Sequence, residues 1–429
     1  MNRKSCKKKY GISRSFIIGG SLLSLTLIIS FALLNENHDA ALGIASAVFA
    51  SFSIAFVLTE RRYLLGNIFM STWMICFHFS LYKLSGLQYS YPSSIGWYIV
   101  LIGLIPLLVE YIIKGKESGT CFSRDARHAA IEIGPLFVYA LALASAVLFA
   151  LVIREYGIFA TEGERQMITS NAGLIVACEV LVRISFYFSA FLFVSRGDKR
   201  LIPVMIYAFV YGLASMSRSL LVSFLVYYAL LGLVIKKTKT MKLVILAVAA
   251  FVLFGILGNI REGVSFSISN YASLASGSSV VDWVYSYVCP NFDNLALQIQ
   301  YGQPSNTLSY FLRPIITLFG LDDASWYSTG YVYVGRLNLG TMFRDYVCDV
   351  GGYALVPFVL TIVALVCILY FKSNDDHMTI IKMIILSEIA LAPLTNHFTS
   401  SVFWLSVAMV LAFGFLLLDF KRRLGKVDE

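Results

Sequence analysis

The sequence predicts an all-α polytopic membrane protein, and three observations carry that prediction. Of its 429 residues, 58% are hydrophobic and only 14% are charged, with a mean hydropathy of +0.75. So few charges do not cover a soluble protein of this length. Unbroken apolar runs of about 16 to 22 residues recur, as bilayer-crossing helices require, whereas a membrane barrel shows alternating segments of roughly 10 residues. Lysine and arginine also divide unequally between alternating loops, as the positive-inside rule predicts.

The apolar runs fit about twelve membrane spans. The stretch 201–235 is too long to cross a bilayer of about 30 Å once, so we expect a break at Ser215–Ser219. The predicted spans are 16–34, 40–58, 64–82, 95–113, 133–153, 172–194, 201–216, 220–235, 243–257, 350–370, 380–394 and 402–418.

The charge distribution orients these spans. If the basic N-terminal segment is cytoplasmic, the cytoplasmic segments hold 24 lysines and arginines, the external segments hold 8, and Arg183 and Lys382 lie within spans. This split predicts a multi-pass membrane protein with both termini in the cytoplasm. The first apolar run has the length of a span and no small-x-small cleavage site follows it, so we expect an uncleaved helix. The net charge of +9 then reflects topology, and we expect no nucleic-acid partner.

One long segment interrupts the apolar pattern, between the ninth and tenth spans. It divides the chain into spans 1–9 (1–258), a large external loop (259–345) and spans 10–12 with a cytoplasmic tail (346–429). The tyrosines and tryptophans of this loop suit both a lipid–water boundary and sugar faces.

Motifs of soluble enzymes are missing from the sequence. It has no Walker loop, no dinucleotide glycine fingerprint and no Gly-x-Ser-x-Gly elbow. The five histidines are scattered and no His/Cys/acid cluster has zinc spacing. We therefore expect neither a metal nor a cofactor.

Arginine dominates the external side, where seven of the eight basic residues are arginines. The planar guanidinium group of arginine matches the geometry of phosphate, whereas the cytoplasmic lysines need only fix the topology. Arg218 opens the eighth span, Arg261 opens the loop, and Arg344 closes it beside Asp345 and Asp349. This pattern predicts an anion site with a nearby carboxylate base at the outer membrane surface; contact with lipid head groups is the plainer interpretation.

Ionisable residues inside the predicted spans form a second candidate group. Glu179 and Arg183 are four residues apart on one helical face, which suits either the wall of a polar cavity or a structural ion pair. Glu388 has no partner on its own helix, so we expect it to face the bundle interior. Cys289 and Cys348 share the oxidising side, where a disulfide is allowed but chance placement is the simpler explanation.

Together these features resemble the Wzy-type O-antigen polymerases, which join lipid-linked oligosaccharide repeat units. The resemblance rests on the number of spans, the single late external loop and several loose local motifs. The motifs are Ser217-Arg218-Ser-Leu-Leu, Gly258-Asn-Ile-Arg261-Glu-Gly263, Thr341-Met-Phe-Arg-Asp-Tyr-Val-Cys-Asp349-Val-Gly-Gly and Tyr287-Val-Cys-Pro-Asn-Phe-Asp-Asn-Leu295.

The resemblance implies a metal-independent glycosyltransferase with a GT-C-like helical architecture. Such an enzyme transfers the growing glycan from undecaprenyl diphosphate to a new lipid-linked repeat unit at the periplasmic face, in lipopolysaccharide biosynthesis. Its partners would be undecaprenyl-diphosphate-linked oligosaccharides, inner-membrane lipids and a chain-length regulator. The implied diphosphate-binding residues are Arg218, Arg261, Arg313, Arg336 and Arg344, and the candidate bases are Asp349, Asp345, Glu262 and His397. The Arg-x10-Gly pattern of some members is not found, because Ala272 and Ala324 stand at the matching positions.

Two other functions remain open at this stage. A lipid-linked oligosaccharide flippase also has about twelve spans, although paired halves and short loops are typical of transporters. An O-antigen ligase would share the helical plan and the arginine-bearing loop but use a lipid A core as acceptor.

Overall fold

A computed structural model describes most of the chain, and every element in the described part is helical. The described residues are 14–33, 39–60, 62–84, 88–115, 134–156, 172–215, 217–235, 279–319, 340–372 and 375–425, with a few positions between 245 and 256. The first half comprises α1 (Arg14–Leu33), α2 (Ala40–Thr59), α3 (Leu64–Leu81), α4 (Ser93–Lys114), α5 (Pro135–Tyr156), α7 (Ala172–Arg196), η2 (Lys199–Leu201), α8 (Ile202–Ala214) and α9 (Arg218–Val234). The second half comprises α11 (Ser279–Val288), α12 (Pro290–Tyr301), α13 (Ser309–Leu318), α14 (Met342–Val350), η5 (Gly351–Tyr353), α15 (Leu355–Leu369), α16 (Asp376–Ala390), η6 (His397–Thr399) and α17 (Ser401–Gly425).

Each predicted span except 243–257 corresponds to one described helix, and most ends agree within a few residues. The expected break at Ser215–Ser219 is confirmed, since α8 ends at Ala214 and α9 begins at Arg218. Only isolated helical positions are described between 245 and 256, so the ninth predicted span lies largely outside the described residues.

Five helices are long and apolar enough to cross a membrane: α2, α3, α4, α5 and α7. Large apolar side chains are exposed on the outer faces of these helices. Ile112 of α4 is 77% exposed and Leu136 of α5 is 84% exposed. Water-soluble proteins rarely leave broad apolar faces uncovered, whereas lipid tails cover them at no cost. The chain therefore has the composition and surface of an α-helical membrane protein.

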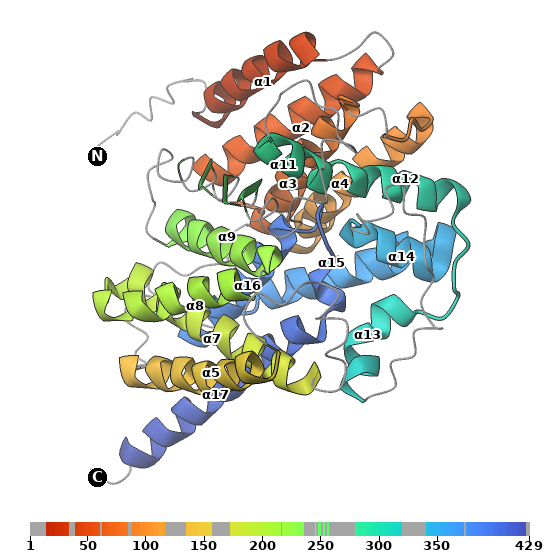
Figure 1. Cartoon of the computed structure of the whole chain (residues 1–429). Coiled ribbons are helices and arrows are strands. Elements are labelled where there is room, and N and C mark those ends of the chain that lie inside the picture. The colour runs from red at the N-terminus through yellow and green to blue at the C-terminus, as the bar shows by residue number, and fades with distance from the viewer. Residues whose placement is uncertain are drawn as a thin grey trace, which may run out of the picture.

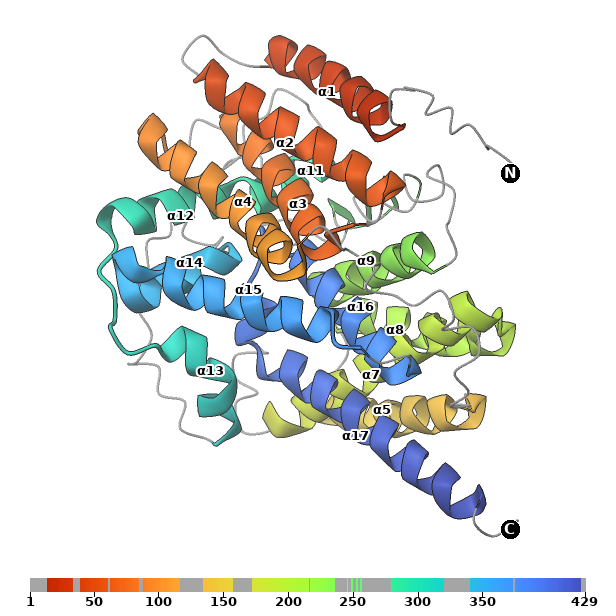
Figure 2. The same ribbon diagram turned by 180° about the vertical axis from the view of Figure 1, so that it is seen from behind.

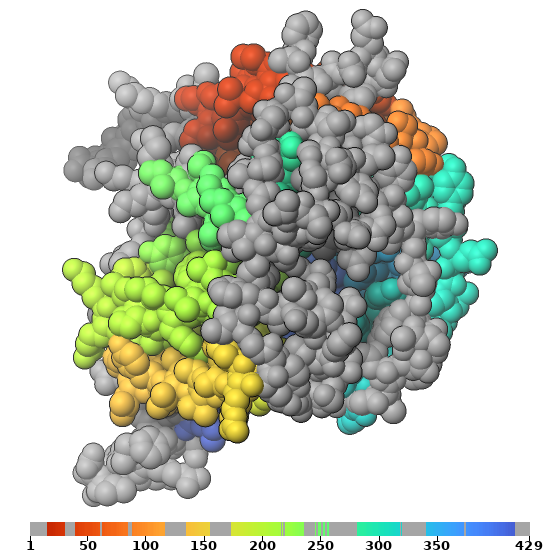
Figure 3. Space-filling model, in the orientation of Figure 1, coloured from red at the N-terminus to blue at the C-terminus, as the bar shows by residue number. Residues whose placement is uncertain are grey.

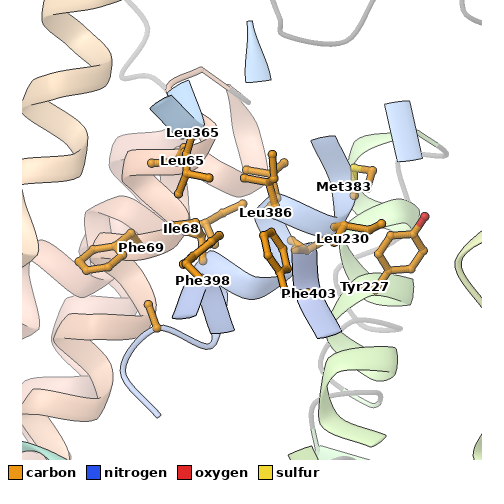
Figure 4. Close-up of a cluster of buried hydrophobic side chains, with 14 of the residues drawn as sticks. Leu65, Ile68, Phe69, Tyr227, Leu230, Leu365, Met383, Leu386, Phe398 and Phe403 are labelled. Atoms are coloured by element: carbon orange, nitrogen blue, oxygen red, sulfur yellow. The ribbon is translucent and has the colours of Figure 1, made fainter. Parts of the chain in front are cut away.

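Helix α16 lies in the middle of the packing. Nearly all of its residues are buried, which is the pattern of a helix surrounded by others rather than one with a lipid-facing side. Its Met383 and Leu386 lie between Leu65 and Ile68 of α3 and Leu230 of α9, and Figure 4 shows these side chains converging. The side chains of α16 are thus packed against neighbouring helices on several sides.

Close backbone contact between α3 and α4 depends on a glycine and a buried carboxylate. A Cβ atom at Gly66 would lie 2.3 Å from Cα of Leu107, so no larger residue fits without moving a helix. The Gly66 amide donates to Glu110 Oε2 (2.7 Å), and the Tyr370 hydroxyl donates to Oε1 of the same carboxylate (2.7 Å). Glu110 thereby satisfies an amide in the first turn of α3 and ties α15 to this pair.

The two ends of the bundle differ. Figures 1 and 2, which view the molecule from opposite sides, both place the beginning of α1 and the end of α17 at one end, with α12, α13 and α14 at the other. We call the end that carries α12–α14 the loop end. In the space-filling view the turquoise residues of α12 and α13 form part of the surface at this end (Figure 3).

The described part of the predicted loop is helical and packed, which the hydropathy pattern did not indicate. Phe292 of α12 lies edge-on to Trp73 of α3 at 5.1 Å, and Phe343 of α14 lies edge-on to Phe358 of α15 at 5.3 Å. The boundary predicted between residues 345 and 346 falls inside α14, so α14 is a continuous buried element joining the loop to the later helices.

Helix α12 is attached to the α3–α4 connection by polar contacts. Lys83 Nζ lies 2.6 Å from Oδ1 of Asp293 and 2.7 Å from the Tyr89 carbonyl, and Gln88 Nε2 donates to Asp293 Oδ2 (3.2 Å). Asp293 is fully buried, so its charge depends on this lysine.

Candidate site at the loop end of the bundle

The site is built around the first turn of α14. Thr341 has extended backbone angles and its side chain accepts a hydrogen bond from the amide of Arg344 (3.3 Å), which is the arrangement of an N-cap. Arg344 and Asp345 therefore stand in the first turn of a short helix. Gly340 leaves room for the arginine, because a Cβ atom there would lie 2.6 Å from Cδ of Arg344.

This turn is docked onto the connection between α16 and α17. The Met342 amide donates to the carbonyl of Ala392 (2.8 Å), and Asn396 Nδ2 donates to the Met342 carbonyl (3.4 Å). The Thr399 hydroxyl reaches Oδ2 of Asp345 at 3.4 Å. Asp345 and η6, which begins at His397, are consequently neighbours although they are far apart in the sequence.

The environment of Asp345 favours its neutral form. Burial raises the pKa of this carboxyl to about 6, against the opposing effects of Arg344, Asn396 and Arg313. A carboxyl with a pKa in that range can hold or release a proton near neutral pH.

Asp349, one turn further along α14, has a different surrounding. Its Oδ1 accepts a hydrogen bond from the Tyr310 amide (2.9 Å) and its Oδ2 accepts one from the Phe311 amide (2.8 Å). Both oxygens are thus directed at the first turn of α13, which has no side-chain cap of its own. Asp349 was predicted as a base, and the structure places it as the cap of α13.

Arg344 carries a buried charge that forms no ion pair among the residues the structure describes. Its residue is 8% exposed, its Nε has no hydrogen-bond partner, and among the described residues no carboxylate oxygen lies within 4.0 Å of its guanidinium nitrogens. Leaving a guanidinium in this state is costly, since buried charges are normally paired. Arg313, on α13, is exposed and close enough to Asp345 to influence its protonation.

His397 lies at the end of a chain of charged groups. Its Nδ1 approaches Oε2 of Glu388 to 3.1 Å, while Oε1 of the same carboxylate lies 3.7 Å from Nη1 of Arg183. Arg183 also contacts Glu179 at 2.8 Å, which confirms the ion pair expected from their spacing on α7. Glu388 is 1% exposed, so the expectation that it faces the bundle interior is confirmed.

Other predicted site residues lie outside the described part of the chain. They are Arg261, Glu262 and Arg336. Arg218 is described only by its backbone, at the beginning of α9, where Ser217 provides no side-chain cap. Cys289 and Cys348 are both buried and free, so they are not bonded to each other.

Three polar residues of the site were not singled out from the sequence: Thr341, Asn396 and Thr399. The first caps α14 and the other two reach its first turn. The available signal for Asn396 and Thr399 was the segment 395–400 between two apolar spans, in which every residue except Phe398 is polar.

The fold and the site define an α-helical membrane-type protein with buried cationic and acidic groups at one end of its bundle. Comparison of the chain with family models, curated proteins and solved structures finds no match.

Proposed function

We propose that the protein is an O-antigen polymerase of the Wzy type with a GT-C-like plan. It would transfer a growing glycan from undecaprenyl diphosphate to a new lipid-linked repeat unit. In this proposal it is a twelve-span inner-membrane protein with cytoplasmic termini, and the loop end faces the periplasm. Lipid-linked oligosaccharides are its substrates.

The observation that carries this proposal is the buried guanidinium of Arg344, which forms no ion pair with any residue in the described part of the chain. A buried guanidinium without an anion is suited to receive one, and a diphosphate offers paired oxygens that match its geometry. The negative charge on a diphosphate increases as it leaves the sugar, so Arg344 stabilises the transition state more than the ground state. Arg313 on the neighbouring helix extends the positive field toward solvent.

The acceptor hydroxyl needs a base, and two of the predicted candidates retain suitable atoms. Asp345 has a pKa near 6, and His397 has a buried Nε2 without a hydrogen-bond partner. Thr399 connects the two candidates, since its hydroxyl reaches Asp345 and it follows His397 by two residues in η6. Asp349 is engaged with the amides of α13, which makes it the weaker candidate.

The test is complementation of a deletion strain, read on a lipopolysaccharide gel. Loss of a polymerase leaves one repeat unit on the core, whereas loss of a flippase or ligase leaves none. We expect Arg344→Met to give the single-unit pattern while still inserting at the wild-type level. Arg154→Met removes an exposed arginine at the end of α5 and serves as the control, with a full ladder expected. A full ladder from Arg344→Met would overturn the role of this arginine, and a deletion strain without any O-antigen would overturn the polymerase.

A purified-protein experiment separates folding from binding. Because Arg344 is buried and forms no ion pair with a described residue, replacing it with methionine removes an unfavourable charge, so thermal unfolding should occur at the wild-type temperature or above. Large destabilisation together with loss of product would show that the arginine is structural instead.

A further inference from the structure

Behind His397 lies a buried series of ionic contacts that the proposed transfer does not by itself require. Glu179 Oε1 accepts hydrogen bonds from Nε (3.0 Å) and Nη2 (2.8 Å) of Arg183. The remaining nitrogen, Nη1, faces Glu388 Oε1 at 3.7 Å, and Oε2 of Glu388 faces His397 Nδ1 at 3.1 Å. The series therefore runs from α7 through α16 to η6 and ends at an imidazole.

Burial increases along this series toward its centre. The side chain of Glu179 is 26% exposed, that of Arg183 is 7% exposed and that of Glu388 is 1% exposed. A structural ion pair is complete with one carboxylate for one arginine, and Glu179 already provides that with two hydrogen bonds. The second carboxylate, Glu388, makes its closer ionic contact with the histidine.

Two buried atoms of the Glu388–His397 pair are left without hydrogen bonds in the described part of the chain. They are Oε2 of Glu388 and Nε2 of His397. The 3.1 Å approach of Nδ1 to Oε2 is thus short but not aligned, as is common for catalytic contacts before substrate binds.

We propose that Glu388 is a positioning residue for His397: held from α7 by Arg183, its carboxylate orients the imidazole with the proton on Nδ1, so that Nε2 acts as the base. This inference rests on the proposed function. The acceptor O–H bond breaks and its proton passes to Nε2, while the oxygen forms a bond to the anomeric carbon. The bond from that carbon to the diphosphate breaks, and the electron pair leaves with the diphosphate toward Arg344.

The charges around the imidazole are consistent with a neutral base. Burial lowers the pKa of His397, Glu388 and Glu179 oppose that shift, and Arg183 adds to it. The described elements around η6 also carry Arg313 on α13 and Arg344, Asp345 and Asp349 on α14. Removing the Glu388 charge should therefore lower the pKa of His397 further.

The orientation is tested without any activity measurement. Protein labelled with ¹⁵N-histidine is reconstituted in lipid and studied by solid-state NMR over a pH series, with His397→Gln used to assign the signal. We expect unprotonated Nε2 and protonated Nδ1 in the wild type. Glu388→Gln should shift the tautomer population toward Nε2–H and move the titration to lower pH. Glu110→Gln, which changes a buried carboxylate elsewhere in the bundle, should leave both unchanged. An identical tautomer and titration in Glu388→Gln would overturn the proposal.

The kinetic part uses proteoliposomes and lipid-linked repeat units. Glu388→Gln should lower kcat by about 10- to 100-fold with little change in KM, as loss of an orienting partner does. The acid limb of the kcat–pH profile should move to lower pH, and Glu388→Asp should recover part of the rate. A purely structural role would reduce active protein without moving that limb.

The outcomes distinguish the two proposals. If His397→Gln keeps wild-type kcat while Arg344→Met makes no polymer, the polymerase assignment stands and the role of Glu388 as positioning residue is wrong. If wild-type protein makes no polymer from lipid-linked repeat units, the proposed function and the base assignment both fall.

Discussion

Asp345 and Asp349 show how one turn of helix separates two carboxyls with different physical roles. Both lie on the same face of α14. Asp349 offers both oxygens to backbone amides of α13, which stabilise its ionised form, whereas Asp345 meets a threonine hydroxyl at 3.4 Å. Burial raises the pKa of both carboxyls; the α13 amides oppose that rise at Asp349, whereas the pKa of Asp345 reaches about 6. The two residues look equivalent in the sequence and differ because of what their partners supply.

The raised pKa of Asp345 predicts a specific pH dependence of stability. The folded protein binds this proton more tightly than the unfolded chain, whose ordinary pKa is 3.8. The resulting stabilisation is present below about pH 4 and is lost as the pH rises through about 6. Thermal unfolding of detergent-solubilised protein should therefore show a smaller loss of stability between pH 4 and 7 in Asp345→Asn than in wild type.

Asp198→Asn is a matched control for this measurement. Asp198 is partly exposed and its pKa is lowered by Arg200, so its removal should not reproduce the effect. If wild type and Asp345→Asn lose stability in parallel over this pH range, the raised pKa of Asp345 is wrong.

At the scale of elements, α12 depends on a residue that precedes it by some 200 positions in the sequence. Lys83 lies in the connection between α3 and α4 and neutralises Asp293, whose side chain is fully buried. The polar face of α12 also includes the buried Asn291, Asn294 and Gln298. Such a face is stable only when its partners are in place.

We expect Lys83→Met to destabilise the protein by roughly 3 kcal/mol, because it leaves the Asp293 carboxylate buried without a counter-charge. The double variant Lys83→Met/Asp293→Asn removes that uncompensated charge and should recover part of the loss. Thermal unfolding and limited proteolysis within 279–319 measure both effects. A double variant no more stable than Lys83→Met alone would contradict the pairing.

The membrane helices and the helices α11 to α14 differ in how far the sequence predicts them. Membrane helices depend on their own composition, so runs such as 40–58 and 95–113 indicate α2 and α4 directly. Helices α11 to α14 are short and partly polar, and their burial depends on distant partners such as Lys83 for Asp293 and Ala392 for Met342. Without such pairing information, the sequence predicted a site at the end of the loop, but not that Asp349 caps α13 or that Glu388 contacts His397.

At the scale of the molecule, the arrangement of both ends predicts the accessibility of probes. The beginning of α1 and the end of α17 share one end of the bundle, and α12 to α14 share the other (Figures 1 and 2). In cells, a fluorescent protein fused after the C-terminus should fluoresce in the cytoplasm. A cysteine introduced at Gln303, in a variant without the native cysteines, should react with an impermeant maleimide from the periplasm.

Cysteine at Asp198, between α7 and η2, is the control and should react only after the membrane is opened. Labelling of both positions from the same side would contradict the proposed twelve-span topology.

The carboxylate of Asp349 has a mechanical consequence for the whole loop end. It joins the amides of α13 to α14, and the Met342 amide joins α14 to the carbonyl of Ala392 beyond α16. A displacement of α13 that kept these bonds would carry α14 with it, and one that broke them would leave a buried carboxylate without donors. Helix α13 is therefore coupled to α14 through the carboxylate of Asp349. A ligand that displaces α13 while these hydrogen bonds are kept would also displace the guanidinium of Arg344. Binding of a ligand at α13 would therefore change the position of the buried charge.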